Sequence, residues 1–147
     1  MKERDSIMGT SKGSAAWSGG LKTGRGTMKP AHAPEAAFSL GTRFEGQPGS
    51  NPEELIGAAL SGCFSMALTS SLEKAGLKPE AVHTEADVKL EKQGEGFAIT
   101  GIALTTRATV PGVEAARFQS IAEETKKNCP VSKALAAVPI TLTASLG

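Results

Sequence analysis

An uncharged stretch of 18 residues, 55–72, constrains the fold of this chain more than any other part of the sequence. Its length is near the lower limit for a helix that spans a membrane. The stretch nevertheless contains five Ser or Thr residues and two Gly residues, and charged residues flank it closely, Glu53 and Glu54 before it and Lys74 after it. We therefore expect a helix that is buried in protein, with no membrane partner.

The boundaries of this helix are signalled by local sequence. Asn51 is placed to cap it, Pro52 suits the first helical position, and Glu54 has the spacing of a capping box. The helix should continue to about Lys74, and Gly76 should end it. Because its apolar residues fall on all sides, other elements should enclose it. Small residues at four-residue spacing would allow a second helix to approach closely.

The remaining chain predicts an α+β fold with antiparallel pairing, because short hairpins and helix-length connections alternate. Expected strands cover residues 15–18, 23–29, 37–40, 82–91, 97–110 and 138–146, with a bulge near Gly101, and a long loop covers residues 41–50. Expected helices beyond the long one cover residues 113–128 and 130–136. We expect residues 1–12 to form a flexible arm and residues 13–147 a single domain.

Charge and composition exclude some classes of partner. The 147 residues include 16 Lys and Arg against 15 Asp and Glu, a net charge of +1, and only five Phe and one Trp as aromatic residues. The chain therefore has neither the basic excess nor the stacking side chains that nucleic-acid binding requires. The charged start, from Met1 to Asp5, is not followed by an apolar signal segment, so we expect a cytoplasmic protein.

Two cysteines, Cys63 and Cys129, are the residues that most suggest chemistry. A C-x-x-C pair is absent and the chain has only two histidines, so a structural zinc site is not expected. Cys63 lies within the long helix, where a free cysteine is ordinarily a small core residue. Cys129 precedes Pro130 at a helix start, where amide donors favour the thiolate, although it also fits a simple turn. A redox pair and two separate packing residues are both open from the residues alone.

Arg43 and Glu53 are candidate partners for a buried thiolate. A cation such as Arg43 would offset the desolvation that raises a thiol pKa, but it could equally be a solvated loop residue. Glu53 could simply compensate the helix dipole. Ten residues separate Glu53 from Cys63, about 15 Å along a helix. Both can belong to one site only if a second copy of the helix runs antiparallel to the first, as a homodimer would allow.

Four short motifs resemble one known family. They are Arg43-Phe44-Glu45-Gly46, Asn51-Pro52-Glu53-Glu54-Leu55, Cys63-Phe64 and Cys129-Pro130-Val131-Ser132. In this order they are similar to the OsmC/Ohr family, and to its OsmC branch more than to its organic hydroperoxide resistance branch. The resemblance implies an OsmC-like α+β fold, with antiparallel sheets around a long buried central helix and an intertwined homodimer that has two active sites at its interface. It also implies thiol peroxidase activity towards organic hydroperoxides, in defence against oxidative or osmotic stress, without a metal or flavin cofactor.

The resemblance also implies a role for each candidate residue. Cys63 would attack the peroxide and become a sulfenic acid, and Cys129 would resolve it as a disulfide. An external dithiol, of the kind carried by a lipoyl protein, would reduce that disulfide. Arg43 would hold Cys63 as the thiolate and Glu53 would orient this arginine, with Arg25 as the alternative arginine. The helix-start reasoning instead makes Cys129 the more acidic thiol.

Two other functions are weighed against the peroxidase. A disulfide reductase or isomerase would ordinarily show a C-x-x-C in a thioredoxin-like order, which is absent. A non-enzymatic dimeric stress or ligand-binding module would use both cysteines for packing or a structural bridge. If the peroxidase interpretation is right, the apolar side chains of Phe44, Phe64 and Met66 favour peroxides with apolar tails.

Overall fold

The computed structural model describes residues 9–147, which form two compact units. The first unit extends to Pro52 and the second covers Glu53–Gly147. Of the predicted arm, residues 1–8 lie outside the described residues, and residues 9–12 form neither helix nor strand. That residues 13–147 behave as one domain stays a prediction.

The first unit contains a three-stranded antiparallel sheet in the order β1-β2-β3. The strands are β1 (Gly13–Ser18), β2 (Arg25–Pro30) and β3 (Ala36–Phe38). The rings of Trp17 and Phe38 lie 5.4 Å apart between their centroids. Both rings approach Gly26, where an added Cβ would lie 2.5 Å from the carbonyl oxygen of Ala16. Glycine is therefore required at this position, because no larger residue fits beneath the rings.

A short helix, α1 (Leu40–Phe44), replaces the first part of the loop expected over residues 41–50. Its start is fixed by a reciprocal pair. The Thr42 N–H donates to Ser39 Oγ at 3.2 Å, and the Ser39 N–H donates to Thr42 Oγ1 at 2.8 Å. The strand expected over residues 37–40 therefore ends at Phe38, and Ser39 caps a helix instead of continuing the strand. Arg43 therefore lies in the last turn of a helix.

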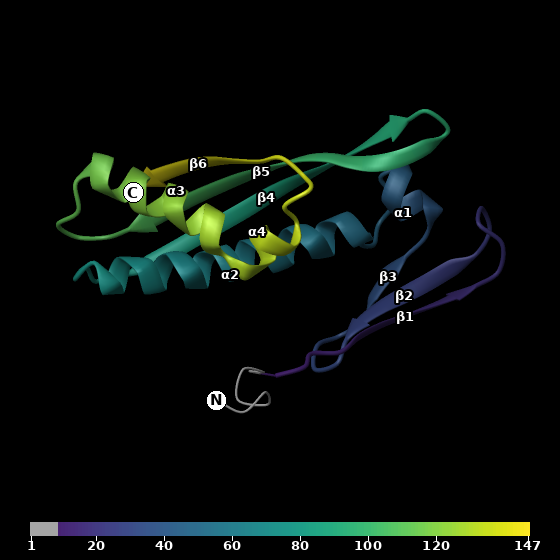
Figure 1. The fold of residues 1–147 in the computed structure, drawn as a ribbon. Coiled ribbons are helices and arrows are strands. Elements are labelled where there is room, and N and C mark those ends of the chain that lie inside the picture. The colour runs from purple at the N-terminus through teal and green to yellow at the C-terminus, as the bar shows by residue number, and fades with distance from the viewer. Residues whose placement is uncertain (1–8) are drawn as a thin grey trace, which may run out of the picture. The chain divides into compact units, whose positions relative to one another are not determined.

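The second unit packs three helices on one face of a three-stranded sheet (Figure 1). Its elements are α2 (Pro52–Lys74), β4 (Ala81–Gln93), β5 (Gly96–Thr109), α3 (Ala115–Asn128), α4 (Pro130–Ala134) and β6 (Ile140–Leu146). The predicted bounds of α2 are confirmed, and Gly76 follows it with a φ of +83°, a backbone conformation that favours glycine. The element order matches the order expected from the sequence.

The pairing of the last strand differs from the antiparallel expectation. β4 and β5 form an antiparallel hairpin, whereas β6 pairs parallel to β5. The reason is the connection: α3 and α4 carry the chain back along the sheet before β6 begins, so β6 runs in the direction of β5. The predicted bulge is confirmed, because Lys89 pairs with Gly101 and Leu90 with Ile99, which leaves Thr100 as the extra residue.

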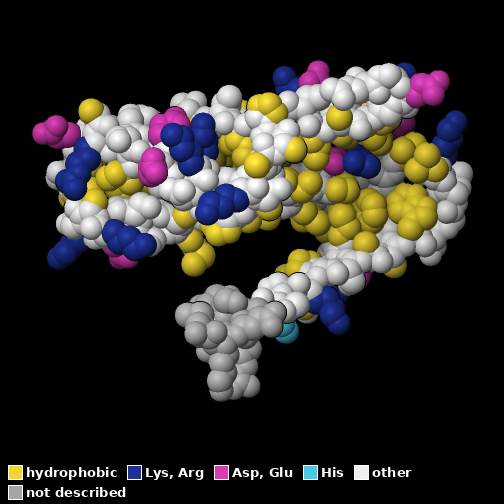
Figure 2. Space-filling view, in the orientation of Figure 1, with side chains coloured by type: hydrophobic (Ala, Val, Ile, Leu, Met, Phe, Trp, Pro, Cys, Tyr) yellow, Lys and Arg dark blue, Asp and Glu magenta, His cyan; other side chains and the backbone are white. Residues whose placement is uncertain are grey.

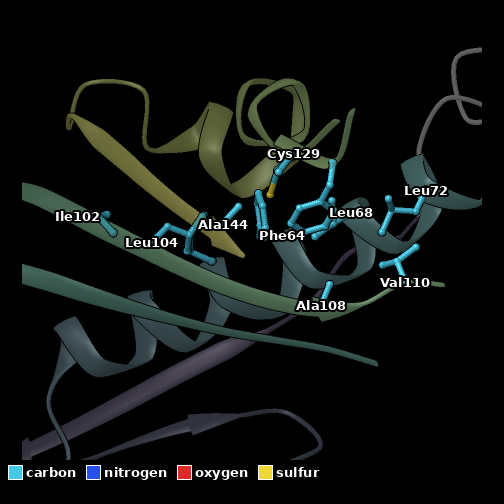
Figure 3. Packing of buried hydrophobic residues seen from close by; sticks show 12 residues of the cluster. Phe64, Leu68, Leu72, Ile102, Leu104, Ala108, Val110, Cys129 and Ala144 are labelled. Carbon is cyan, nitrogen blue, oxygen red and sulfur yellow. The ribbon is translucent and has the colours of Figure 1, made fainter. Parts of the chain in front are cut away.

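One stripe of α2 is buried against the sheet and α3. Its buried residues recur every three or four positions: Glu53, Gly57, Leu60, Phe64, Leu68 and Leu72. Figure 3 shows Phe64, Leu68 and Leu72 pointing towards the end of β5, where Ala108 and Val110 lie. The four apolar residues of this stripe, from Leu60 to Leu72, form the hydrophobic core of the unit together with side chains of the sheet and of α3.

The opposite face of α2 is not covered by the other described elements of its own unit. Met66 on this face is 78% exposed, and hydrophobic side chains reach the surface along α2 (Figure 2). By length and composition α2 could cross a membrane, a criterion that core helices of soluble proteins also meet. Enclosure of this second face by protein stays a prediction.

A chain of hydroxyl groups fixes α2 on the sheet. Ser65 Oγ donates to Thr84 Oγ1 at 2.7 Å, and Thr84 Oγ1 lies 2.9 Å from Thr106 Oγ1. Thr106 Oγ1 in turn donates to the carbonyl of His83 at 3.2 Å. Each of these buried or half-buried hydroxyls is thereby satisfied, which favours one rotation of the helix about its axis. That rotation also sets the direction of Cys63, two residues before Ser65.

Candidate active site

Cys129 lies at the junction of α3 and α4, where the backbone holds it at both sides. Its N–H donates to the Thr125 carbonyl at 2.9 Å, and its carbonyl accepts from the Lys133 N–H at 3.0 Å. Thr125 is itself anchored to α2, because its Oγ1 lies 3.3 Å from Ser71 Oγ. The side chain of Cys129 is fully buried, with 0% exposure. Figure 3 shows its sulfur directed into the core beside Phe64.

Cys63 lies near the middle of α2 and is partly exposed. Its sulfur is 3.0 Å from the sulfur of Cys129, although 66 positions separate the two residues in the sequence. Both cysteines are free thiols in this structure. Since a disulfide has a sulfur–sulfur distance of about 2.05 Å, a movement of roughly 1 Å would join them. The question that the sequence left open is thus answered in favour of contact.

The surroundings shift the pKa values of the two thiols in opposite directions. Burial raises the pKa of Cys63, and the neighbouring Cys129 raises it further, while the backbone N–H of Val131 opposes this only in part. Burial also acts to raise the pKa of Cys129, but donors outweigh it and the pKa is lowered. These donors are the Cys63 thiol, the N–H and hydroxyl of Ser132 and the N–H of Val131. Within this unit, Cys129 is therefore the more acidic of the two thiols.

The candidate arginines belong to the first unit. Arg43 lies in the last turn of α1, with its guanidinium carbon 5.4 Å from the centre of the Phe44 ring. This distance is within the range of a cation–π contact. Arg25 is the first residue of β2 and lines a surface hollow together with Lys22 and Glu45. The role of either arginine beside Cys63 stays a prediction.

Glu53 lies in the first turn of α2 and is only 8% exposed. It belongs to the same helix as Cys63, ten residues earlier, so the axial separation is about 15 Å. The structure therefore does not bring Glu53 to the cysteine pair along its own helix. Its place in the site still requires the antiparallel copy of α2 that the helix-length reasoning predicts.

Ser132 is a residue of this site that sequence reasoning missed. It follows Cys129 by three positions in α4 and is 6% exposed. Apart from the Cys129 sulfur, whose pKa its hydroxyl lowers, its Oγ has no hydrogen-bond partner among the described residues. The only signal in the sequence was a hydroxyl residue within the Cys-Pro-Val-Ser motif. Such a residue is so common in loops that burial had to be observed.

Comparison with known proteins assigns the chain to a family. Residues 44–143 match the family model described as OsmC-like protein. Peroxiredoxin OsmC of Escherichia coli (strain K12) is 48% identical over 128 residues, which are 86% of this chain and 90% of that protein. The chain belongs to the OsmC-like family. The family match includes Glu53 and both cysteines and begins one residue after Arg43.

More distant OsmC-like relatives extend the comparison. The organic hydroperoxide resistance protein of Xanthomonas axonopodis pv. citri (strain 306) is 32% identical over 100 residues, 67% of this chain and 68% of that protein. The crystal structure of the organic hydroperoxide resistance protein OhrB of Bacillus subtilis has a TM-score of 0.72 at 23% identity, over 96% of this chain and 100% of that chain. An OsmC-like protein of unknown function from Vibrio cholerae has a TM-score of 0.74 at 16% identity, over 93% and 99%. These likenesses establish the OsmC/Ohr-like fold.

Proposed function

We propose that this OsmC-like protein is a thiol peroxidase that reduces organic hydroperoxides. The observation that carries the proposal is the 3.0 Å contact between two free thiols from distant parts of the chain. A peroxiredoxin and an organic hydroperoxide resistance protein among its relatives support the same class of reaction.

The reaction follows from the two thiols alone. The Cys63 thiolate attacks the terminal oxygen of the hydroperoxide, the sulfur–oxygen bond forms, the oxygen–oxygen bond breaks, and an alcohol leaves after protonation. Cys129 then attacks the Cys63 sulfenic acid and releases water, which leaves a disulfide between the two residues. A dithiol, in our proposal one carried by a lipoyl protein, returns both cysteines to thiols and is itself oxidised to a disulfide.

The substrate class depends on the apolar surface near Cys63. Phe64 was expected to contribute, but its side chain is fully buried in the core and cannot touch a substrate. Met66 is exposed and lies three residues after Cys63, and Ala67 lies four residues after Cys63. Both side chains are therefore on the same side of the helix as Cys63. We expect cumene hydroperoxide to be reduced faster than hydrogen peroxide in matched turnover assays. A strong preference for hydrogen peroxide would contradict this assignment.

An arginine beside Cys63 would lower the pKa of its thiol and so favour attack by Cys63. We expect Arg43→Ala to slow the peroxide reaction roughly 10- to 100-fold near neutral pH, because an opposite charge lowers a pKa by about 1–3 units. Since the pKa of Cys63 is already raised by burial, loss of the cation should move the rising limb of the pH–rate profile to higher pH. Single-turnover kinetics between neutral and alkaline pH measure both effects.

Arg25→Ala is the matched control for this experiment. If Arg43 supplies the charge, Arg25→Ala should retain the wild-type pH profile. A loss confined to Arg25→Ala would instead assign the role to Arg25.

We also propose that two chains form the functional unit. The uncovered apolar face of α2 and its small residues at four-residue spacing support close packing of two helices. An antiparallel neighbour would bring its Glu53 near the middle of α2. Light scattering should give twice the chain mass of 15.0 kDa. A monomer would remove Glu53 from the proposed site.

A stoichiometric titration tests the proposed function. Reduced protein is treated with cumene hydroperoxide, and thiols and intact mass are then measured. The wild type should lose two thiols, and Cys129→Ser should gain one oxygen as a sulfenic acid at Cys63. If both thiols survive excess peroxide, the cysteines are structural and the non-enzymatic ligand-binding module takes the place of the peroxidase.

A further inference from the structure

The hydroxyl of Ser132 is buried without a hydrogen-bond partner of ordinary geometry in the reduced protein, as far as the described residues go. Leaving a buried hydroxyl unsatisfied costs free energy, so such a group calls for an explanation. One explanation is that another state of the protein supplies the partner. The candidate partner is the sulfur of Cys129, three residues earlier at the start of the same helix, because the Ser132 hydroxyl favours the negative form of that sulfur.

Three donors of α4 converge on this sulfur. The backbone N–H of Ser132, its hydroxyl and the backbone N–H of Val131 each favour the negative form of Cys129. Cys63 receives only the Val131 N–H from this set. The surroundings of the two sulfurs are therefore unequal, and negative charge is better supported on Cys129.

Access to the two sulfurs is unequal as well. Cys129 has 0% exposure, whereas Cys63 is partly exposed. In thiol–disulfide exchange, the attacking thiolate must reach one sulfur, and the other sulfur leaves with the electron pair. Cys63 is the more accessible sulfur for attack, and Cys129 is the better stabilised leaving group. Both features favour opening of the disulfide by attack on Cys63.

Resting on the peroxidase function above, we propose that Ser132 is a positioning residue for regeneration of the enzyme. Its hydroxyl donates to the Cys129 sulfur as the Cys63–Cys129 disulfide opens, so that Cys129 leaves and the reductant bonds to Cys63. The proposal rests on the buried unpartnered hydroxyl, its place beside Cys129 and the unequal exposure of the two sulfurs.

The exchange balances in two steps. A thiolate of the dithiol attacks the Cys63 sulfur, the bond between the two cysteines breaks, and the electron pair passes to Cys129, which later takes a proton. The second thiol of the reductant then attacks the reductant sulfur bound to Cys63. Cys63 is released as a thiolate, and the reductant leaves as its own disulfide.

The test isolates this half-reaction from peroxide chemistry. Wild type, Ser132→Ala and Ser132→Thr are oxidised with diamide, and reduction by dithiothreitol is followed by thiol release. Ser120→Ala is the matched control, because Ser120 is exposed on α3. We expect Ser132→Ala to be reduced roughly threefold or more slowly, because leaving-group pKa controls the rate. Ser132→Thr and Ser120→Ala should retain the wild-type rate.

A second measurement separates positioning from a merely structural role. In a Cys63→Ser background, thiolate absorbance against pH reports the pKa of Cys129. Removing the Ser132 hydroxyl should raise this pKa by about one unit, as loss of a hydrogen bond to a charged group does. The melting temperature of Ser132→Ala should change little, because among the described residues the hydroxyl has no hydrogen-bond partner to lose other than the Cys129 sulfur.

The position of the mixed disulfide gives the remaining check. Diamide-oxidised wild type is treated with glutathione, quenched with acid and mapped by mass spectrometry, and the adduct should lie on Cys63. An adduct on Cys129, or wild-type reduction rate and pKa in Ser132→Ala, would overturn the proposal for Ser132 without touching peroxide reduction. Failure of diamide to form the disulfide would overturn it too. If diamide forms the disulfide as expected but the protein does not react with peroxide, the proposed function is contradicted instead.

Discussion

Cys63→Ser is expected to lower the consumption of cumene hydroperoxide by roughly three orders of magnitude or more, as loss of a catalytic nucleophile does. A serine hydroxyl remains protonated at neutral pH, so it cannot replace the thiolate that attacks the peroxide. The measurement is steady-state peroxide consumption with dithiothreitol as the reductant. The fold should survive, because the exchange replaces one sulfur atom at a partly exposed position.

This variant also decides between the two sulfurs. Within its own unit, Cys129 is the more acidic thiol but is fully buried, whereas Cys63 is the more accessible. Cys129→Ser is the matched control, and it should still react once with peroxide at a rate near that of the wild type. If instead Cys129→Ser loses the first reaction and Cys63→Ser keeps it, the attacking sulfur is Cys129 and the roles are exchanged.

Phe64→Ala is expected to have the largest effect on stability, a loss of about 3–5 kcal/mol in the free energy of unfolding. The Phe64 ring has 0% exposure and packs where α2, the sheet and α3 meet. Its removal would leave a cavity between α2, the sheet and α3, which these packed elements could fill only in part. For a chain of this size, the melting temperature should fall by roughly 10 °C. Denaturant unfolding followed by circular dichroism measures the free energy.

Phe97→Ala is the control for this substitution. The same side chain is removed, but Phe97 lies at the start of β5 and is 57% exposed. Its loss should cost less than a third of the Phe64 effect. Equal losses for both variants would contradict the place of Phe64 in the hydrophobic core.

Local sequence determined most of the secondary structure of this protein. The alternation after residue 81 predicted β4, and the uncharged stretch with Pro52 and Gly76 predicted both ends of α2. These signals are reliable because helix ends and strand faces are encoded by residues a few positions apart. The prediction of a loop over residues 41–50 is wrong at its start, because Ser39 fits both the end of a strand and the cap of a short helix, and local sequence does not separate the two.

The sequence motifs also indicated that both cysteines are candidate reactive residues, but not that their side chains are in contact. A helix period says which residues share a face, whereas contact between positions 63 and 129 depends on how α3 and α4 return over the sheet. The same connection decides that β6 runs parallel to β5. Such long-range geometry has no local signal, because it results from packing the whole core at once.

Burial at the candidate site likewise came from the tertiary structure. The sequence names Ser132 as one hydroxyl among many, and only the packed fold shows that it is enclosed beside Cys129 without an ordinary partner. The relative acidity of the two thiols follows from that enclosure and from the donors around it. Sequence therefore determined the elements and the reactive residue types. The tertiary structure decided their chemistry, because desolvation and hydrogen-bond geometry exist only once distant segments pack together.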